Sequence, residues 1–231
     1  MSGAINIVDD DHEQAQTFAQ MLGKNFGQIH IWGSATEWMR SYVPTQPVVL
    51  IVDFFFPGER VSGEDVLDWI VANKHPIVPL VISGDVDVER CRDWMRKGAH
   101  YVIPKPITRA VFLKLAPALT QAKELASSIF AEYQQDLVVI HRLSVCTQRE
   151  REIVFRRLQG QSPQSIADFF GCNYRTVIKH FSNAMRHLSG REDDTTNCTE
   201  DSLQLEHIHD KVRLYRLLLA EFSHIELRGH S

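Results

Sequence analysis

Polar residues that could do chemistry together stand where short apolar runs of this chain end. In chain order they are Asp9, Asp10, Asp53, Ser83 and Lys105. Clustered carboxylates without His or Cys suit a hard cation with oxygen ligands, and Mg²⁺ fits best because it leaves positions for phosphate oxygens. With the cation offsetting the repulsion, one carboxylate can attack a phosphoryl group, while a lysine and a hydroxyl hold its oxygens. Singly, each residue has an ordinary structural role, so the prediction depends on whether the fold brings them together.

The apolar runs predict a sheet that would do so. They cover residues 4–8, 28–32, 48–52, 77–82 and 100–103, and helical patterns lie between them. Helix start signals are clearest at Ser34 and Glu37, which fit a capping box. Strand followed by helix, five times, predicts an α/β domain with a doubly wound five-stranded parallel sheet. In such a sheet the ligand crevice lies outside the carboxyl ends of the strands, which is where the polar residues stand.

Several short motifs in this half of the chain resemble the receiver domain of two-component response regulators. They are Ile7-Val8-Asp9-Asp10, the segment from Asp53 to Pro57, Val81-Ile82-Ser83-Gly84, Gly98-Ala99 and Lys105-Pro106. The resemblance covers residues 1–120 and implies a flavodoxin-like receiver fold. It also implies a sensor histidine kinase as partner and Mg²⁺ as cofactor.

The same resemblance implies roles for the residues of the crevice. Asp53 would be the phosphoacceptor, and the Lys105-Pro106 bond would be cis. The implied metal ligands are Asp9, Asp10, Asp53 and the backbone carbonyl of Phe55. The implied phosphate-binding and switch positions are Ser83, Gly84, Lys105 and Val102.

Two features depart from the receiver pattern. Residues 58–62 form a longer loop beside the acceptor, which would alter access to the phosphate or its lifetime. Val102 occupies the place of the family's switch aromatic, and Tyr101 comes one position earlier. Because side chains alternate along a strand, Tyr101 points to the opposite side. We therefore expect Ser83 to move toward the phosphoryl group while Val102 transmits little.

The segment from 142 to 191 has nine basic and three acidic residues in a chain whose net charge is −4. Such a basic island is typical of a phosphate-backbone binder, although a solvated helix face can look the same. Its helix signals predict three short helices. These signals are the capping box of Thr147 and Glu150, the Ser162-Pro163 start, the Gly171 turn and the cap at Asn173.

This segment resembles the helix-turn-helix DNA-binding domain of LuxR/FixJ-type regulators. The matching residues are Leu143, Thr147, Arg149, Glu150, Ile166, Ala167, Arg175, Thr176, Val177 and His180, while Ile178 departs from the usual Lys. By this resemblance the helix after Asn173 is the recognition helix. The predicted DNA-binding residues are Arg175, Thr176, Lys179, His180, Asn183 and Arg186. A helical bundle for protein contacts is the alternative, and His180 could equally serve packing.

The end of the chain, residues 191–231, reads as an acidic linker followed by an amphipathic helix. Steps of three and four residues form a heptad seam of Leu205, Ile208, Val212, Tyr215, Leu219 and Phe222. This seam predicts a dimerisation helix, but a helix folded back on the DNA-binding module would show the same stripe. A connecting helix at 121–141 completes the expected domains, after a receiver at 1–120 and before a helix-turn-helix domain at 142–190.

Composition excludes several other classes. No apolar run approaches the roughly 20 residues of a membrane helix, and the first residues lack the features of a signal peptide. We therefore expect a cytoplasmic protein with no membrane partner. Four scattered cysteines argue against a disulfide framework or a metal knuckle.

The sequence predicts a response regulator that is phosphorylated on Asp53 and then binds double-stranded DNA as a homodimer, affecting transcription and, indirectly, RNA polymerase. Since the receiver modifies only itself, we do not expect an enzyme with an external substrate. Three alternatives stay open. They are a regulator that works without phosphorylation through an atypical switch, a receiver that signals through protein contacts alone, and an aspartyl-phosphate phosphatase or phosphotransferase.

Overall fold

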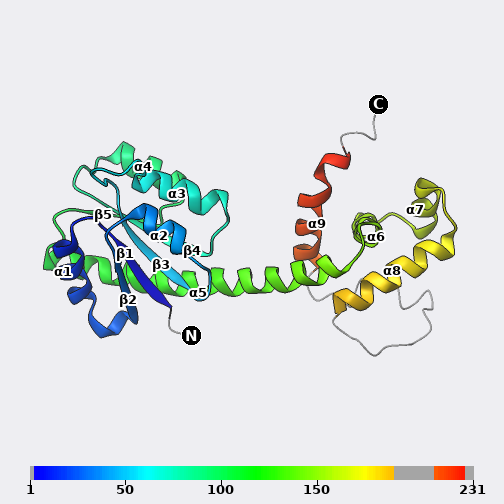
Figure 1. Ribbon diagram of the computed structural model, residues 1–231, viewed down its shortest axis with the longest axis horizontal. Helices are drawn as coiled ribbons and strands as arrows, with labels where there is room; N and C mark the ends of the chain where they lie inside the picture. Colours follow the sequence, from blue (N-terminus) through cyan, green and yellow to red (C-terminus); the bar gives the residue numbers. More distant parts are fainter. Residues whose placement is uncertain (1–2, 190–210, 227–231) are drawn as a thin grey trace. The chain divides into compact units, whose positions relative to one another are not determined.

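The computed structural model describes residues 3–189 and 211–226 of the chain. The chain forms two compact units, Met1–Tyr133 and Gln134–Ser231 (Figure 1). The first unit contains a parallel sheet and the second is helical.

The sheet of the first unit has five parallel strands in the order β2-β1-β3-β4-β5. Their bounds are β1 Ala4–Val8, β2 Gln28–Trp32, β3 Val48–Asp53, β4 Ile77–Ser83 and β5 Tyr101–Pro104. These strands confirm the predicted doubly wound fold, and each lies within one residue of a predicted run. The helices between them are α1 His12–Leu22 with a short 3-10 turn at Gly23–Phe26, α2 Ala35–Ser41, α3 Gly63–Ala72 and α4 Val88–Arg96.

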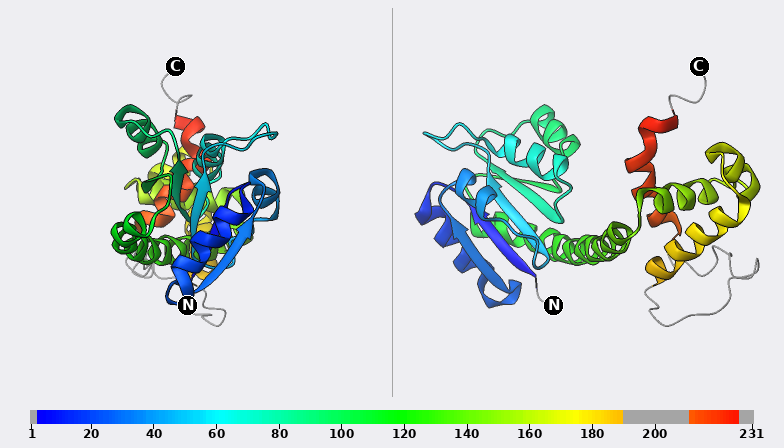
Figure 2. Two further views of the ribbon diagram at one scale, coloured as in Figure 1. Left: turned by 90° about the vertical axis from the view of Figure 1, so that its left-hand side faces the viewer. Right: turned by 45° about the vertical axis from the view of Figure 1, so that its right-hand side comes forward.

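Helices cover both faces of the sheet (Figure 2). Along β3, Val49 and Ile51 pack with α1 and with α5 (Arg109–Val145), whereas Leu50 and Val52 pack on the other face with α2, α3 and α4. Because both faces are covered, β1, β3 and β4 are buried throughout and read as continuous apolar runs.

Helix α5, Arg109–Val145, contributes to both units. Leu119, Ala122 and Ala126 pack in the core of the first unit, and Leu143 packs in the core of the second. The first unit therefore extends to Tyr133 rather than to the predicted boundary at residue 120. In the described part of the chain, no helix has the length and apolar character that a membrane span requires.

The second unit contains α6 Gln148–Leu158, α7 Pro163–Phe170, α8 Tyr174–Ser189 and α9 Lys211–Glu226, together with the end of α5. The predicted helix signals are confirmed. Thr147 and Glu150 form a complete capping box, Pro163 occupies the first turn of α7, and Gly171 ends that helix at φ 59°. A left-handed C-cap favours glycine because it has no Cβ to clash. The Asn173 side chain accepts a hydrogen bond from the Arg175 amide at the start of α8.

Helix α9 packs on the helices of its own unit. Leu214, Leu218 and Phe222 are buried in the core that α6 and α8 share, and Phe155 of α6 stacks on Phe222 at 5.6 Å between ring centroids. Glu221 accepts a hydrogen bond from Arg151 at 2.9 Å.

The predicted heptad seam is therefore wrong in register. Leu214 and Leu218, which lie outside it, are buried, whereas Val212 is 81% exposed. The partly buried Tyr215 and Leu219 and the buried Phe222 contact the core of the same unit. Leu205 and Ile208 lie outside the described residues. The stripe of α9 is explained by intrachain packing, and a homodimer stays a prediction.

Candidate functional site

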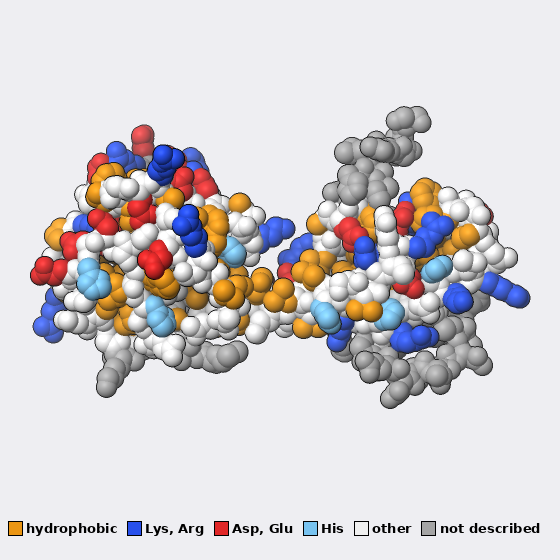
Figure 3. Space-filling view, in the orientation of Figure 1, with side chains coloured by type: hydrophobic (Ala, Val, Ile, Leu, Met, Phe, Trp, Pro, Cys, Tyr) orange, Lys and Arg blue, Asp and Glu red, His pale blue; other side chains and the backbone are white. Residues whose placement is uncertain are grey.

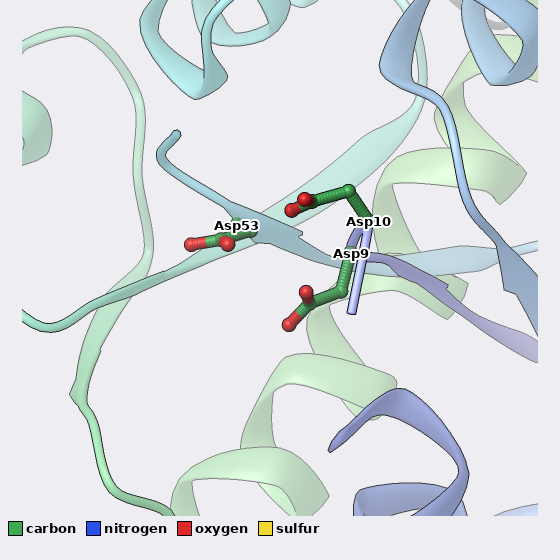
Figure 4. Close-up of side chains that lie close together, drawn as sticks. All are labelled: Asp9, Asp10 and Asp53. Carbon is green, nitrogen blue, oxygen red and sulfur yellow. The ribbon is translucent and has the colours of Figure 1, made fainter. Parts of the chain in front are cut away.

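The predicted crevice residues meet at the carboxyl edge of the sheet. Asp9 and Asp10 follow β1, Asp53 ends β3, Ser83 ends β4, and Lys105 follows β5. The carboxylates of Asp9, Asp10 and Asp53 lie close together (Figure 4), and one oxygen from each lies within 4.8 Å of the others. The fold therefore gathers the side chains that the sequence placed at separate strand ends.

The Asp53 carboxylate is held by two donors. One oxygen accepts a hydrogen bond from the Phe54 amide at 2.8 Å, and the other accepts one from Lys105 Nζ at 2.7 Å. Asp53 is only 6% exposed. Burial opposes the charged form of Lys105, but its hydrogen bond to Asp53 and the nearby carboxylates raise its pKa overall. Lys105 thus stays charged beside the acceptor, and its peptide bond to Pro106 is cis, as expected.

Asp9 is the most deeply buried carboxylate of the cluster, with 1% of its surface exposed. Burial raises its pKa to about 6, and the negative charge of Asp53 acts in the same direction. The Asp11 amide, which donates to Asp9 at 2.9 Å, and Lys105, whose Nζ lies 3.4 Å away, lower the pKa and only partly offset the effect of burial. A carboxylate in this position gains from a further nearby cation.

The donor set fits Mg²⁺. All three gathered side chains offer carboxylate oxygens, and Asp10 is exposed, so the cluster has a side open to water. An open pocket next to the cluster is lined by Asp10, Asp53, Phe54, Phe55, Pro57, Ser83, Gly84, Asp85, Arg90 and Lys105. Phe55, whose carbonyl was predicted as a further ligand, and Gly84 therefore both belong to the pocket. Mg²⁺ prefers such oxygen ligands and keeps several waters.

The predicted switch hydroxyl is engaged with its own loop. Ser83 Oγ accepts a hydrogen bond from the Asp85 amide at 3.2 Å. At the other predicted switch position, Val102 is half-buried against the core on the α2, α3 and α4 face, while Tyr101 is 39% exposed. No aromatic side chain therefore occupies the position of Val102.

The longer loop after Pro57 is tied to α2. Its Glu59 carboxylate accepts hydrogen bonds from the Thr36 hydroxyl at 2.6 Å and from the amides of Thr36 and Ala35 at 3.1 and 3.2 Å. Partial burial opposes ionisation, but these hydrogen bonds lower the pKa of Glu59 overall. Of the predicted capping box, the structure shows the half in which Ser34 accepts from the Glu37 amide at 3.1 Å. The sequence had no signal for the contribution of Glu59, because its partner lies more than twenty residues earlier in the chain.

Gly63, the first residue of α3, lies against the backbone of Asp53 and Phe54. A Cβ at this position would stand 2.6 Å from the Asp53 carbonyl oxygen and 2.8 Å from the Phe54 Cα. The Gly63 amide donates to the Phe54 carbonyl at 2.9 Å. The close approach explains glycine at this position.

Sequence reasoning missed two links between the pocket and α4. Phe54 packs on Trp94 of α4 with 4.5 Å between ring centroids. Arg90, in the first turn of α4, reaches back to the carboxylate of Asp85 and lines the pocket. Trp94 and Arg90 lie in no motif, because their roles depend on how α4 packs against the rest of the unit.

The second unit presents cations on α8. Arg175, Thr176, Lys179 and Arg186, four of the six predicted DNA-binding residues, are exposed. Figure 3 shows Lys and Arg side chains at several points of the visible face of this unit. Their spacing places them along one side of α8, opposite the buried Val177, Phe181 and Leu188.

The other two predicted contacts, His180 and Asn183, turn toward α6. Glu150 of the capping box is 6% exposed, and its carboxylate lies 3.9 Å from His180 Nδ1. Burial raises the pKa of Glu150, but hydrogen bonds from Thr147 and Asn183 and the charge of His180 lower it overall. These contacts give His180 and Asn183 partners within their own unit, and their contact with DNA stays a prediction.

Comparison with known proteins decides what the first unit is. The sequence profile of the response regulator receiver domain matches residues 5–116. The chain contains a response regulator receiver domain. Asp9, Asp10, Asp53, Ser83 and Lys105, to which the sequence assigned receiver roles, all lie within the matched residues.

Curated relatives share more than the receiver domain. The transcriptional regulatory protein FixJ of Rhizobium meliloti (strain 1021) is 27% identical over 187 residues, covering 81% of this chain and 89% of that protein. FixJ of Azorhizobium caulinodans is 25% identical over 183 residues, covering 78% of this chain and 83% of that protein. The solved structure of the response regulator StyR, at 24% identity and a TM-score of 0.56, covers 81% of this chain and 92% of that one. The likeness to StyR concerns the fold alone.

Proposed function

We propose that this protein is a two-component response regulator that is phosphorylated on Asp53 by a sensor histidine kinase and that then controls transcription by binding DNA through α8. The observation that carries the proposal is the contact of 2.7 Å between Lys105 Nζ and the Asp53 carboxylate, inside a cluster of three carboxylates. A buried carboxylate with an adjacent ammonium is arranged for phosphoryl chemistry.

The residues of the pocket support each part of the transfer. An Asp53 oxygen attacks the phosphorus of a phosphohistidine, the P–N bond breaks, and the imidazole leaves with a proton. Lys105 is placed to hold a phosphoryl oxygen, and Ser83 can release the Asp85 amide to bind another. Asp9, Asp10 and Asp53 would hold Mg²⁺, which supplies positive charge to the transferring group. The protein modifies only itself in this scheme, so we do not propose an enzyme with an external substrate.

The second unit supports the DNA-binding half of the proposal. Arg175, Lys179 and Arg186 are exposed on a helix that follows the Gly171 turn. A helix, a short turn and a second helix with a free basic face is the arrangement that helix-turn-helix proteins place in a major groove. The two FixJ relatives are transcriptional regulatory proteins, and the match to them extends beyond the receiver domain. Paired half-sites would require a homodimer, and an effect on RNA polymerase would follow indirectly.

The first half of the proposal is tested by phosphoryl transfer to the full chain from acetyl phosphate with Mg²⁺. We expect the native chain to gain one acyl phosphate, detected by intact mass and by its lability to hydroxylamine. Asp53→Asn should gain none. Modification of Asp53→Asn to the native level would contradict the assignment of Asp53.

Regulation without phosphorylation is a second candidate, favoured by one observation. Val102 occupies the switch position, so the pocket has no aromatic side chain there to signal its state. This candidate predicts DNA binding that is strong in the unmodified protein and unchanged by a phosphoryl mimic.

A further inference from the structure

The mouth of the Asp53 pocket carries a cation that the receiver chemistry described above does not use. The guanidinium of Arg90 forms an ion pair with the Asp85 carboxylate and also donates to the Asp85 carbonyl at 3.3 Å. Its Nε lies 3.8 Å from the carboxylate of Asp87, the N-cap of α4. The side chains of Arg90 and Asp85 are 48% and 79% exposed. Ion pairs with this exposure are weak, so the guanidinium is free to change partner.

Phosphorylation would change the balance of charge in this pocket. An acyl phosphate dianion together with Asp9 and Asp10 carries more negative charge than Lys105 and one Mg²⁺ offset. Arg90 and Lys105 are the cations among the pocket-lining residues of the described chain, and Lys105 already contacts Asp53. A guanidinium presents several N–H donors in a planar fork that matches phosphate oxygens. The modified pocket would therefore attract Arg90 more strongly than the single carboxylate of Asp85 does.

We propose that Arg90 is a phosphoryl-binding residue, paired with Asp85 in the unmodified protein and transferred to the phosphoryl oxygens once Asp53 is modified. The proposal rests on the proposed function, because it requires Asp53 as the phosphoacceptor. The transfer frees the Asp85 loop, whose amide is bound by Ser83 Oγ. Ser83 Oγ and the Arg90 guanidinium thus break their contacts with Asp85 and bind the same phosphoryl group. The first turn of α4 thus receives the signal by a polar route that does not need an aromatic residue at Val102.

Beryllofluoride with Mg²⁺ is the probe, because it binds the acceptor carboxylate as a stable mimic of aspartyl phosphate. Its affinity is measured by calorimetry on the full-length native chain, Arg90→Gln and Asp85→Asn. We expect Arg90→Gln to bind about tenfold more weakly, as the loss of a charge-assisted hydrogen bond at a half-exposed site predicts. Asp85→Asn should bind about threefold more tightly, because Arg90 has lost its resting partner. Changes of the same sign in both variants would overturn the proposal.

The double variant separates release of Arg90 from simple charge repulsion. The Asp85 carboxylate also repels the anionic probe directly, which would make Asp85→Asn tighter without any role for Arg90. If the tightening acts through Arg90, the double variant binds as weakly as Arg90→Gln alone. If Asp85→Asn tightens binding just as much in the Arg90→Gln background, the proposed exchange of partners is wrong.

Arg96→Gln is the matched control. Arg96 lies on the same helix and pairs with Asp93 at 3.1 Å, but it is not among the residues that line the pocket. We expect its affinity for the probe to equal that of the native chain, and an equal loss in Arg96→Gln and Arg90→Gln would overturn a specific role for Arg90. A native chain that binds no beryllofluoride would contradict the assignment of Asp53 instead. Native binding with an unchanged Arg90→Gln would overturn the Arg90 proposal alone.

Discussion

The two units of this protein use charged side chains in opposite ways. In the receiver, Asp9, Asp53 and Lys105 are largely buried and contact one another at the edge of the sheet. In the helical unit, Arg175 and Lys179 stand exposed on α8, and Glu150 is the one buried charged side chain among its described residues. A compact buried cluster can act on one phosphorus atom, whereas separated surface cations suit an extended polyanion. Under the proposed function, the phosphoryl chemistry would reside in the receiver and DNA recognition in the helical unit.

We expect the largest effect from Lys105→Met, which removes the cation from the buried cluster of the receiver. Removal of a charged donor from a buried site of phosphoryl transfer should slow acylation of Asp53 by more than about 100-fold. The measurement is the rate of phosphorylation by acetyl phosphate with Mg²⁺. DNA binding of the unmodified protein should not change, because the recognition residues are in the other unit. Near-native acylation by this variant would contradict the assigned role of Lys105.

Leu218→Ala tests the apolar packing of α9 in the helical unit. Leu218 is fully buried where α9 packs on the core, so its truncation should lower the free energy of unfolding of this unit by about 3 kcal/mol. Urea denaturation followed by circular dichroism measures the change.

Val212→Ala is the control for this prediction, because Val212 is on the same helix but 81% exposed. It should change stability by less than about 0.5 kcal/mol. Equal effects of the two substitutions would show that α9 does not pack as described.

A smaller effect is expected from Lys179→Ala on the exposed face of α8. Loss of one phosphate contact should weaken binding to all DNA fragments alike and reduce the salt dependence of log K by about 1. Titrations at several salt concentrations measure this slope. An unchanged slope would place Lys179 outside the DNA interface.

The smallest effect concerns the pH dependence of Glu150. Its pKa is lowered in the folded protein, so its contribution to stability is present above its ordinary pKa of 4.5 and is lost as the pH falls through the lowered value. We expect Glu150→Gln to cost about 1 kcal/mol at neutral pH, because the amide can keep the capping box but loses the charge that strengthens its hydrogen bonds. Unfolding of both proteins at pH 7 and in acid should show that the difference shrinks in acid. A difference that is constant with pH would contradict this role.

Much of the receiver could be predicted from the sequence because its signals are local. Strands buried on both faces appear as continuous apolar runs, and the ends of parallel strands gather at one edge. Asp9, Asp10 and Asp53 therefore meet as expected. Contacts between a loop and the start of a helix have no such signal, and for this reason the contacts of Glu59 and Arg90 were found only in the structure.

The helical unit was harder to predict. A helical pattern shows which face of a helix is apolar, but it does not show what packs against that face. His180 and Asn183 lie near the exposed side of α8, and only the position of Glu150 on α6 shows that they turn inward. The apolar residues of α9 could likewise pack either on a second copy of the chain or on the core of their own unit. The burial of Leu214 and Leu218 decides for the core.

The central claim is that the state of Asp53 controls DNA binding. The most direct measurement compares binding of the native chain and Asp53→Ala to genomic DNA fragments, with and without beryllofluoride and Mg²⁺. We expect the mimic to tighten DNA binding by the native chain and to leave binding by Asp53→Ala unchanged. Strong binding by both proteins that ignores the mimic would contradict it.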